Sequence, residues 1–403
     1  MSVISSINLI RVLDSRGNST LEATILTENG GFGRAIAPSG ASTGEYEAVE
    51  LPPIDAINAA KTHTIPLIEG KISSTDQFLV DEILRTSDST ENFSRIGSNS
   101  AVAISMAAAK AAANSVNLPL YAYLGSHIDP GVFPIPLGNI IGGGAHAHNS
   151  THIQEFLAAP IGAPSVSDAI FANAAVHKLS RELIIAQEFS CAKGDEGGWA
   201  APISDKIAFD IMHKATSQIS KEFQFEIKFG IDMAASEFYD AASDMYVYGD
   251  LLRSPAEQID YVSGLSEEYS LAYIEDPLHE DDFEGFAKLT KSIGDKSLIC
   301  GDDLFATNVS RIQKGIELQS ANSIIIKPNQ IGTLTDTLNA IELAKQNNIV
   351  PVISHRSGES EDTTISHIAF ATQAPFIKTG VVGGERTAKL NELIRIEQEV
   401  NKI

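Results

Sequence analysis

The chain has 403 residues, of which 43% are apolar and 20% charged, as in a globular protein with a large buried core. Its 52 acidic and 29 basic side chains give a net charge of −23, which excludes nucleic acid and anionic membranes as partners. No stretch reaches the roughly 20 uninterrupted apolar residues of a membrane-spanning helix, and the first residues lack a secretory leader pattern. We therefore expect a cytoplasmic protein whose two cysteines, Cys191 and Cys300, are reduced thiols.

The first part of the chain, residues 1–126, predicts a small α+β domain. Residues 1–36 alternate apolar and polar side chains, with turn residues at 15–18 and 29–31, which predicts an antiparallel meander. Residues 37–45 (APSGASTGE) are too rich in small side chains for regular structure and form either a linker or a lid over the substrate. Helical periodicity follows over residues 54–68, 76–86 and 99–124, and residues 127–131 contain boundary signals.

The second part, residues 133–403, predicts a larger domain of a different kind. Two strand candidates, 133–141 and 153–159, precede two long helical patterns, 166–187 and 201–220. Six short apolar runs follow, and they end at the charged or metal-binding residues 232, 275, 302, 327, 355 and 378. Four of the five intervals, of 27, 25, 28 and 23 residues, leave room for one helix. The order ββαα(βα)6 predicts an α/β fold with an eight-stranded barrel.

Three of the strand ends are acidic. Because catalytic groups of such barrels gather at the C-terminal strand ends, Asp232, Glu275 and Asp302 are expected to converge. Oxygen ligands of this kind suit Mg²⁺ or Mn²⁺ better than Zn²⁺. Asp276 and Asp303 are neighbours that could support these ligands. The alternative is that the acids cap helices or form salt bridges.

Two further strand ends are lysines, Lys327 and Lys378. A lysine at a barrel mouth commonly forms a salt bridge. Opposite a metal site, however, nearby positive charge is expected to lower the pKa of a lysine toward neutrality. A neutral lysine can remove a proton from carbon, provided that cations stabilise the resulting anion.

Three other motifs carry candidate functional groups. His355, Arg356 and Ser357 follow a strand in VISHRSGE and form either a phosphate clamp or a capped turn. Glu196 lies in the glycine loop GDEGG, from which a carboxyl group can reach into a cleft. The run HAHNSTHIQE spaces three histidines so that they could bind zinc, which keeps open a metal-dependent barrel hydrolase built on His146, His148 and His152.

The chain resembles the enolase family almost from end to end. The motifs that carry this resemblance are LDSRGNST, PSGASTGE, IQEF, GDEGG, IDMAASEF, IEDP, IKPNQIGTLT, ISHRSGESEDT, IKTG and ERTAKLNELIRIEQE. The resemblance implies a Mg²⁺-dependent lyase that interconverts 2-phosphoglycerate with phosphoenolpyruvate and water, in glycolysis and gluconeogenesis. It also implies two Mg²⁺ ions per active site, one of them bound together with the substrate. Another acid-sugar dehydratase or racemase of the same superfamily would lack PSGASTGE, and a binding-only protein would not need an intact site.

Residue roles follow from the matching motifs. Asp232, Glu275 and Asp302 would hold the first Mg²⁺, and Ser39, on the closing lid, would help to bind the second. The residues expected to take part in catalysis are Lys327 as the base, Glu196 as the acid with Glu155 beside it, His146, and Lys378 on the substrate carboxylate and enolate. The side chains expected to contact the substrate are His146, Glu155, Lys327, His355, Arg356, Ser357, Lys378 and Ser39.

Some features depart from the family pattern. The basic segment expected after Leu51 is missing, which shortens the small domain and affects the expected contact between subunits. Trp199 and two alanines stand after GDEGG where the family has Phe-Ala. No catalytic group is lost, and a homodimer or higher homo-oligomer is expected.

Overall fold

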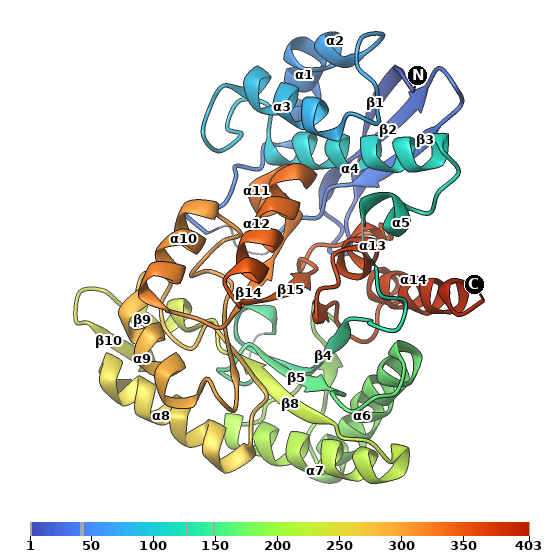
Figure 1. Ribbon diagram of the computed structural model, residues 1–403. Helices are drawn as coiled ribbons and strands as arrows, with labels where there is room; N and C mark the ends of the chain where they lie inside the picture. Colours follow the sequence, from blue (N-terminus) through green and yellow to red (C-terminus); the bar gives the residue numbers. More distant parts are fainter. Residues whose placement is uncertain (1, 41–43, 126–127, 148–149, 403) are drawn as a thin grey trace.

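The computed structural model describes residues 2–40, 44–125, 128–147 and 150–402, arranged in an N-terminal and a C-terminal part (Figure 1). The N-terminal part begins with a three-stranded antiparallel sheet in the order β1-β2-β3. Its strands are β1 (Ile4–Leu13), β2 (Ser19–Thr27) and β3 (Phe32–Ile36). The tight turns that the polar residues 15–18 and 29–31 predict join these strands, which confirms the meander.

Five helices complete the N-terminal part: α1 (Pro53–His63), α2 (Ile65–Ile68), α3 (Gln77–Asp88), α4 (Ser98–Ser115) and α5 (Leu120–Leu124). Two expected helices are divided. Pro66 stands in the first turn of α2, where its missing N–H costs no helical hydrogen bond, so residues 54–68 form two helices. The single helix expected over residues 99–124 is wrong, because Asn117 adopts a left-handed φ of 56° and Pro119 restarts the chain as α5.

The C-terminal part is a closed barrel of eight strands. Its last strand pairs with its first, and all neighbours are parallel except β5, which runs antiparallel to β4 and β8. The strands are β4 (Ile135–Gly142), β5 (Glu155–Ala159), β8 (Lys228–Asp232), β12 (Tyr273–Glu275), β13 (Leu298–Gly301), β14 (Ser323–Ile326), β15 (Val350–Ser354) and β16 (Phe376–Lys378).

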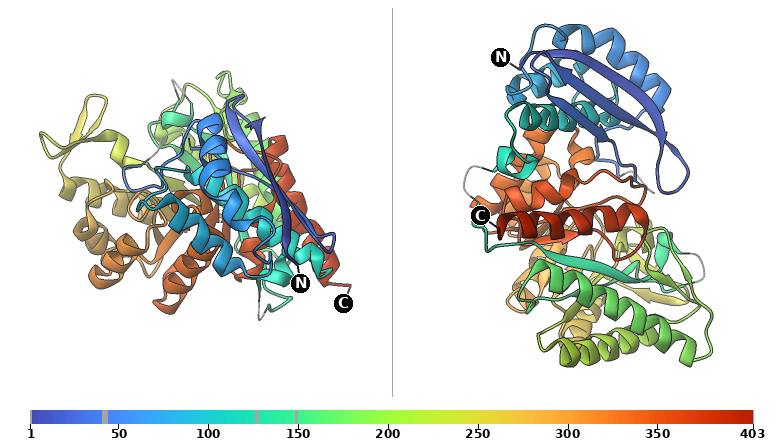
Figure 2. Two further views of the ribbon diagram at one scale, coloured as in Figure 1. Left: turned by 90° about the horizontal axis from the view of Figure 1, so that it is seen from above. Right: turned by 90° about the vertical axis from the view of Figure 1, so that its right-hand side faces the viewer.

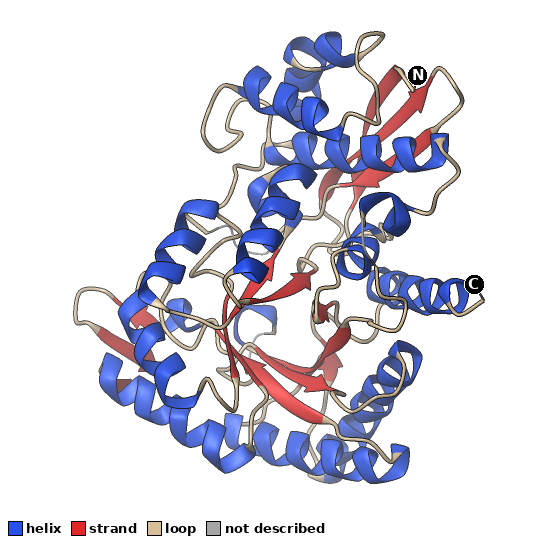
Figure 3. Cartoon of the chain, in the orientation of Figure 1, coloured by secondary structure: helices blue, strands red, loops and turns tan. Residues whose placement is uncertain are grey.

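Helices surround these strands on the outside (Figure 3). They are α6 (Val166–Ala186), α7 (Asp205–Phe223), α8 (Pro255–Tyr269), α9 (Phe283–Ile293), α10 (Val309–Leu318), α11 (Pro328–Ile331), α12 (Leu334–Gln346), α13 (Thr364–Ala371) and α14 (Gly384–Val400). The chain order confirms ββαα(βα)6. No helix in the described part of the chain is long and apolar enough to cross a membrane.

Two small insertions were not predicted. A short 3-10 helix, η2 (Ala235–Phe238), and a three-stranded sheet of β9 (Tyr239–Asp240), β10 (Met245–Tyr248) and β11 (Leu251–Arg253) fill the one long interval between strand ends. The hairpin of β6 (Ala192–Lys193) and β7 (Trp199–Ala200) adds to the edge of β4. The turn of this hairpin is the GDEGG loop, so the hairpin fixes that loop against the barrel.

The interior of the barrel is filled by side chains. Leu137, Leu157, Tyr273, Ile325 and Val352 form one buried cluster inside it. A filled barrel has no through-channel, so a ligand can reach the strands only at their ends. The six predicted strand-end residues all lie at the C-terminal ends.

The N-terminal part is attached beside this mouth. Lys110 on α4 forms a 2.7 Å ion pair with Asp362, and Arg16 in the β1–β2 turn lies 3.1 Å from the Asp195 carboxylate. Asp81 on α3 accepts a 2.9 Å hydrogen bond from the backbone N–H of Thr335. Figure 2 shows the two parts stacked, with α14 lying between the N-terminal sheet and helices α6 and α7.

Candidate active site

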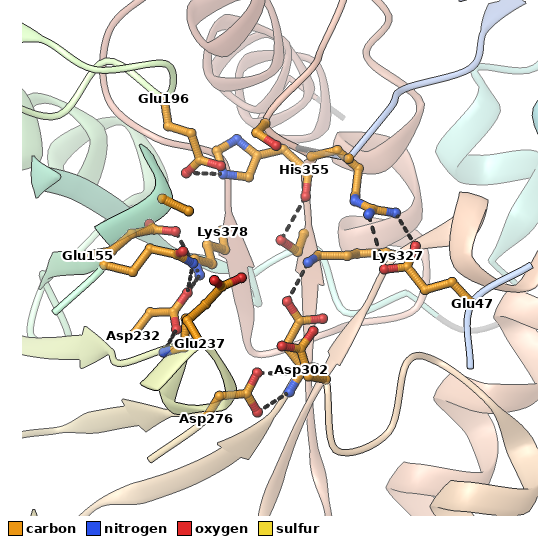
Figure 4. A pocket seen from close by; sticks show the side chains of 18 residues that line it. Glu47, Glu155, Glu196, Asp232, Glu237, Asp276, Asp302, Lys327, His355 and Lys378 are labelled. Carbon is orange, nitrogen blue, oxygen red and sulfur yellow. Dashed lines mark hydrogen bonds and ion pairs between the residues drawn. The ribbon is translucent and has the colours of Figure 1, made fainter. Parts of the chain in front are cut away.

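The strand ends surround a cavity at the mouth of the barrel (Figure 4). Strands β8, β12 and β16 end at Asp232, Glu275 and Lys378, and residues 302, 327 and 355 directly follow β13, β14 and β15. The predicted residues that line the cavity are Glu155, Glu196, Asp232, Asp302, Lys327, His355, Arg356, Ser357 and Lys378. Its lining also includes Glu47, Glu237, Asp276 and Asp303.

Lys378 lies among three carboxylates. Its Nζ donates to Asp232 Oδ2 at 2.9 Å and to Glu275 Oε2 at 2.8 Å, and it lies 3.2 Å from Glu155 Oε1. Burial disfavours its charge, but the surrounding carboxylates outweigh burial and raise the pKa of Lys378 well above its ordinary value. Lys378 therefore remains an ammonium group, which suits electrostatic stabilisation and not proton abstraction.

Lys327 forms an ion pair with Asp302. Burial disfavours the lysine charge, yet the Asp302 carboxylate outweighs both burial and the cations Arg356 and Lys378, so the pKa of Lys327 is raised. Without a bound cation, the charge nearest to Lys327 is an anion, so the lowered pKa that the sequence analysis expects opposite a metal site stays a prediction. Burial would raise the pKa of Asp302, but the positive charge of Lys327 outweighs burial and lowers it.

A group of three carboxylates forms one wall of the cavity. Oxygen atoms of Asp276, Asp302 and Asp303 lie within 4.8 Å of one another, and no other such group of three occurs in the described part of the chain. Asp276 accepts hydrogen bonds from the backbone N–H groups of Asp302 at 3.0 Å and Asp303 at 2.9 Å. The sequence analysis named Asp276 only as a supporting neighbour. In the structure it fixes the turn that contains Asp302.

The acidic wall has the chemistry of a divalent cation site. Burial raises the pKa of Glu275 to about 8 and that of Asp303 to about 7, so these groups resist ionisation without a cation. Glu275 Oε1 is buried and accepts no hydrogen bond from a described residue. Oxygen donors of this kind suit Mg²⁺. The predicted set Asp232, Glu275 and Asp302 does not form such a close group among the described residues, because Lys378 lies between Asp232 and Glu275 and Lys327 pairs with Asp302.

Glu196 and His355 meet on the opposite wall. The Glu196 Oε2 and His355 Nε2 atoms are 3.3 Å apart, and both side chains are buried. Burial, assisted by the nearby Arg386 guanidinium, lowers the pKa of His355 to about 4. His355 is therefore neutral at physiological pH, beside the carboxyl group of the predicted acid.

Arg356 is held by a residue that the sequence did not indicate. Its guanidinium forms a two-pronged ion pair with Glu47, at 2.8 Å and 3.2 Å. Glu47 follows the PSGASTGE motif by two positions, and this is the one signal that could have pointed to it. Ser39, in the same motif, is paired with Gly358 through backbone hydrogen bonds of 2.8 Å and 2.9 Å. Ser39 also donates its hydroxyl to Glu50 Oε2 at 3.0 Å, so it is anchored at the edge of the barrel.

Of the three histidines in the run HAHNSTH, the structure describes the side chain of His152 alone. His146 ends the short helix η1 (Gly144–His146), but its side chain is not described, and His148 lies outside the described residues. His152 Nδ1 lies 3.4 Å from Asp205 Oδ2, and its ring contacts Phe238 and Tyr248. The one described histidine side chain of this run thus pairs with Asp205 and not with the acidic wall.

The fold and the site define a barrel enzyme with a carboxylate-rich, lysine-containing mouth, a class suited to cation-assisted chemistry on small anions. Residues 130–403 match the family model described as "Enolase, C-terminal TIM barrel domain", and residues 4–124 match "Enolase, N-terminal domain". The chain is 60% identical to the enolase of Halorubrum lacusprofundi over 399 residues, which cover 99% of this chain and all of the relative.

More distant relatives agree. The enolase of Methanothermobacter thermautotrophicus is 49% identical over 407 residues, covering 99% of this chain and 97% of that protein. The chain belongs to the enolase family. It is a lyase with phosphopyruvate hydratase activity in glycolysis, and the family is metal-dependent. The family membership therefore argues against the two alternatives, a zinc hydrolase and another acid-sugar dehydratase.

Proposed function

We propose that this cavity interconverts 2-phosphoglycerate and phosphoenolpyruvate with Lys327 as the base and Glu196 as the acid. The observation that carries the proposal is that these two side chains enter one cavity from different walls (Figure 4). A base and an acid on opposite walls can act on neighbouring carbon atoms of one small substrate. The proton leaves C2, and the hydroxyl group at C3 leaves as water after protonation by Glu196.

The base must be neutral before it can accept a proton. Asp232, Glu275 and Asp302 would hold the cation, and Asp302 would then no longer pair with Lys327 alone. Bound Mg²⁺ supplies positive charge that stabilises the dianion formed from the substrate. Lys378, which is held protonated by its carboxylate neighbours, stabilises the same negative charge through its ammonium group.

Arg356 and Ser357 are proposed to hold the phosphate, with His355 and Glu155 beside the reacting carbon atoms. Arg356 is preorganised by Glu47 in a buried pair, and its planar guanidinium suits a phosphate oxygen as well as a carboxylate. His146 is proposed to line the same pocket.

The second Mg²⁺ is proposed to bind with the substrate at the PSGAST segment. Ser39 is the residue predicted for it, although its hydroxyl and both of its backbone groups already have partners. The motif contains another serine, Ser42, which lies outside the described residues. A comparison of Ser39→Ala with Ser42→Ala in Mg²⁺ titrations of activity tests the assignment. Loss of the second cation's effect only in Ser42→Ala would transfer the role to that residue.

The proposal includes a cytoplasmic homodimer or larger homo-oligomer built from the two parts, residues 1–126 and 133–403. Both cysteines are free thiols, which suits a reducing compartment. Leu26 and Phe32 are exposed and lie opposite each other on neighbouring strands of the meander, where we propose a contact with another copy. Light scattering at micromolar concentration measures the assembly, and a mass of one chain would contradict it.

The test of the two catalytic roles separates proton abstraction from water loss. Lys327→Met is expected to lose both exchange of the C2 hydrogen with solvent deuterium and formation of phosphoenolpyruvate, each by at least about 10²–10⁴-fold. Glu196→Gln is expected to retain exchange while it loses water elimination. Lys296→Met, at an exposed lysine, is the matched control. Retained dehydration in Lys327→Met would remove the role given to that lysine.

A further inference from the structure

A fully buried arginine lies behind the catalytic residues. Arg386, in the first turn of α14, has no exposed surface. A buried guanidinium is costly unless its donors find acceptors. Here Nη1 donates to Arg356 O at 2.6 Å and to His355 Nδ1 at 2.8 Å, and Nη2 donates to Ser357 O at 2.7 Å. A longer contact of 3.5 Å reaches Asp195 O in the GDEGG loop.

The contact with His355 determines which ring nitrogen carries the proton. An arginine side chain has only donors and stays charged in proteins. His355 Nδ1 must therefore offer its lone pair to Arg386, which leaves the proton of the neutral ring on Nε2. That nitrogen is the one 3.3 Å from Glu196 Oε2. A proton on Nδ1 would instead bring two donors face to face.

We propose that Arg386 is a positioning residue that locks His355 in its Nε2–H form, so that the ring donates to Glu196 and orients this carboxyl group toward the substrate. The proposal rests on the role of Glu196 as the acid. Arg386 acts through His355 and touches neither the substrate nor the reacting atoms.

The charges around His355 favour the same state. It faces Glu196 from the GDEGG loop, Arg386 from α14 and Glu359 from the segment after β15. Burial and the Arg386 charge both oppose protonation of the ring and lower the pKa of His355 to about 4. The ring thus keeps one donor and one acceptor throughout the physiological pH range.

Arg386 also joins two loops, which would be a purely structural role. It bonds the carbonyl groups of the 355–357 segment and reaches that of Asp195. A structural role alone predicts that substitutions alter melting temperature and substrate affinity. The tautomer role predicts that they alter the His355 ring and kcat.

The direct test is ¹⁵N NMR of histidine-labelled protein without metal or substrate, so that its outcome is independent of the proposed reaction. The His355 signals are assigned by their loss in His355→Gln. In the wild type we expect a neutral ring protonated at Nε2. In Arg386→Gln, whose amide can also accept, we expect a mixture of tautomers. A wild-type ring protonated at Nδ1, or at both nitrogens, overturns the proposal whether or not the Arg386 variants fold.

Kinetics supply the second test. Arg386→Lys and Arg386→Gln are expected to lower kcat about 10- to 100-fold, with a smaller change in KM. In a His355→Gln background the same substitutions should cause little further loss, because residues that act through one another are not additive. Arg253→Lys, at a remote arginine on β11, is the matched control. Equal kcat losses in both backgrounds would mean that Arg386 does not act through His355.

Discussion

At the scale of single residues, the site depends on charges that are buried next to one another. Lys378 touches three carboxylates, and Asp276 accepts the amide hydrogens of the two aspartates after β13. The backbone of Asp276 has a left-handed φ of 39°, which is uncommon outside glycine. Such strain persists only where surrounding contacts compensate for it. Here the strained backbone places the Asp276 carboxylate against the backbone N–H groups of Asp302 and Asp303.

Asp276→Asn tests this positioning role. Asparagine tolerates the left-handed backbone but leaves one of the two amide groups without its carboxylate acceptor. We expect Mg²⁺ to bind about 10- to 100-fold more weakly, as measured by calorimetry. Asp295→Asn, at an exposed aspartate, should leave binding unchanged. Wild-type affinity in Asp276→Asn would show that Asp276 does not position the cation ligands.

His177 gives a prediction for pH. Its Nε2 lies 2.9 Å from Gly197 O in the GDEGG loop, its ring stacks on Trp199, and burial lowers its pKa to about 4. The unfolded chain, with a pKa near 6.5, takes up the proton first, so this group costs stability as the pH falls from about 6.5 to about 4. Between pH 7 and pH 5 the cost is about 2 kcal/mol.

His177→Gln keeps a donor for Gly197 and removes the titration. The fall in unfolding free energy between pH 7 and pH 5, measured by urea titration, should therefore be about 2 kcal/mol smaller than in the wild type. The other titrating groups contribute equally to the pH dependence of both proteins, so their contributions cancel in this comparison. An equal pH dependence in the two proteins would contradict the lowered pKa.

At the scale of elements, close backbone packing determines where the N-terminal helices lie. Strand β3 meets α4 at Gly33, where an added Cβ atom would fall 2.0 Å from Ala107 O and 2.4 Å from Ala111 N. Both neighbours are backbone atoms of α4, so they cannot turn aside. The alanine-rich sequence of α4 permits this approach because its side chains are small.

A pair of glycine substitutions of opposite sign tests this contact. Gly33→Ala forces the sheet and α4 apart and is expected to destabilise the protein by about 1–3 kcal/mol. Gly264→Ala lies on an exposed position of α8 with open space around it, and it should stabilise the protein by about 0.5–1 kcal/mol. Melting temperatures measure both effects. A neutral Gly33→Ala would mean that the sheet can slide on the helix.

At the scale of the whole molecule, a strongly acidic protein places three buried or nearly buried cations in one cavity. The net charge is −23, yet the cavity for an anionic substrate contains Lys327, Arg356 and Lys378. These cations are fixed by buried carboxylates from both parts of the chain, including Glu47. Because each of these cations is paired with a carboxylate, the proposed Mg²⁺ would supply part of the positive charge that an anionic substrate needs.

The surface charge itself predicts a response to salt. Self-repulsion destabilises the compact state, and raising ionic strength from 0.1 M to 1 M shortens the screening length from about 10 Å to about 3 Å. We expect the melting temperature to rise over this range of KCl. Tetramethylammonium chloride should act similarly if screening is the cause. A rise with KCl alone would indicate specific cation binding, and a fall would contradict the prediction.

The sequence by itself determined the meander, the ββαα(βα)6 order and the residues at the strand ends. Each of these depends on local periodicity or on a motif, and both are complete within a few residues. The predicted helix boundaries were wrong where a single residue interrupts a helix, as Asn117 and Pro119 do between α4 and α5. The small sheet β9–β11 was missed because its strands are too short to show a period.

Only the tertiary structure determines which distant side chains contact each other. Glu47 lies 309 positions from Arg356, and Arg386 lies 31 positions from His355 on a different element, so no spacing along the chain connects them. The direction of the Lys327 pKa was also beyond the sequence. A pKa depends on burial and on the nearest charge, and only the folded chain places the Asp302 carboxylate against that amine.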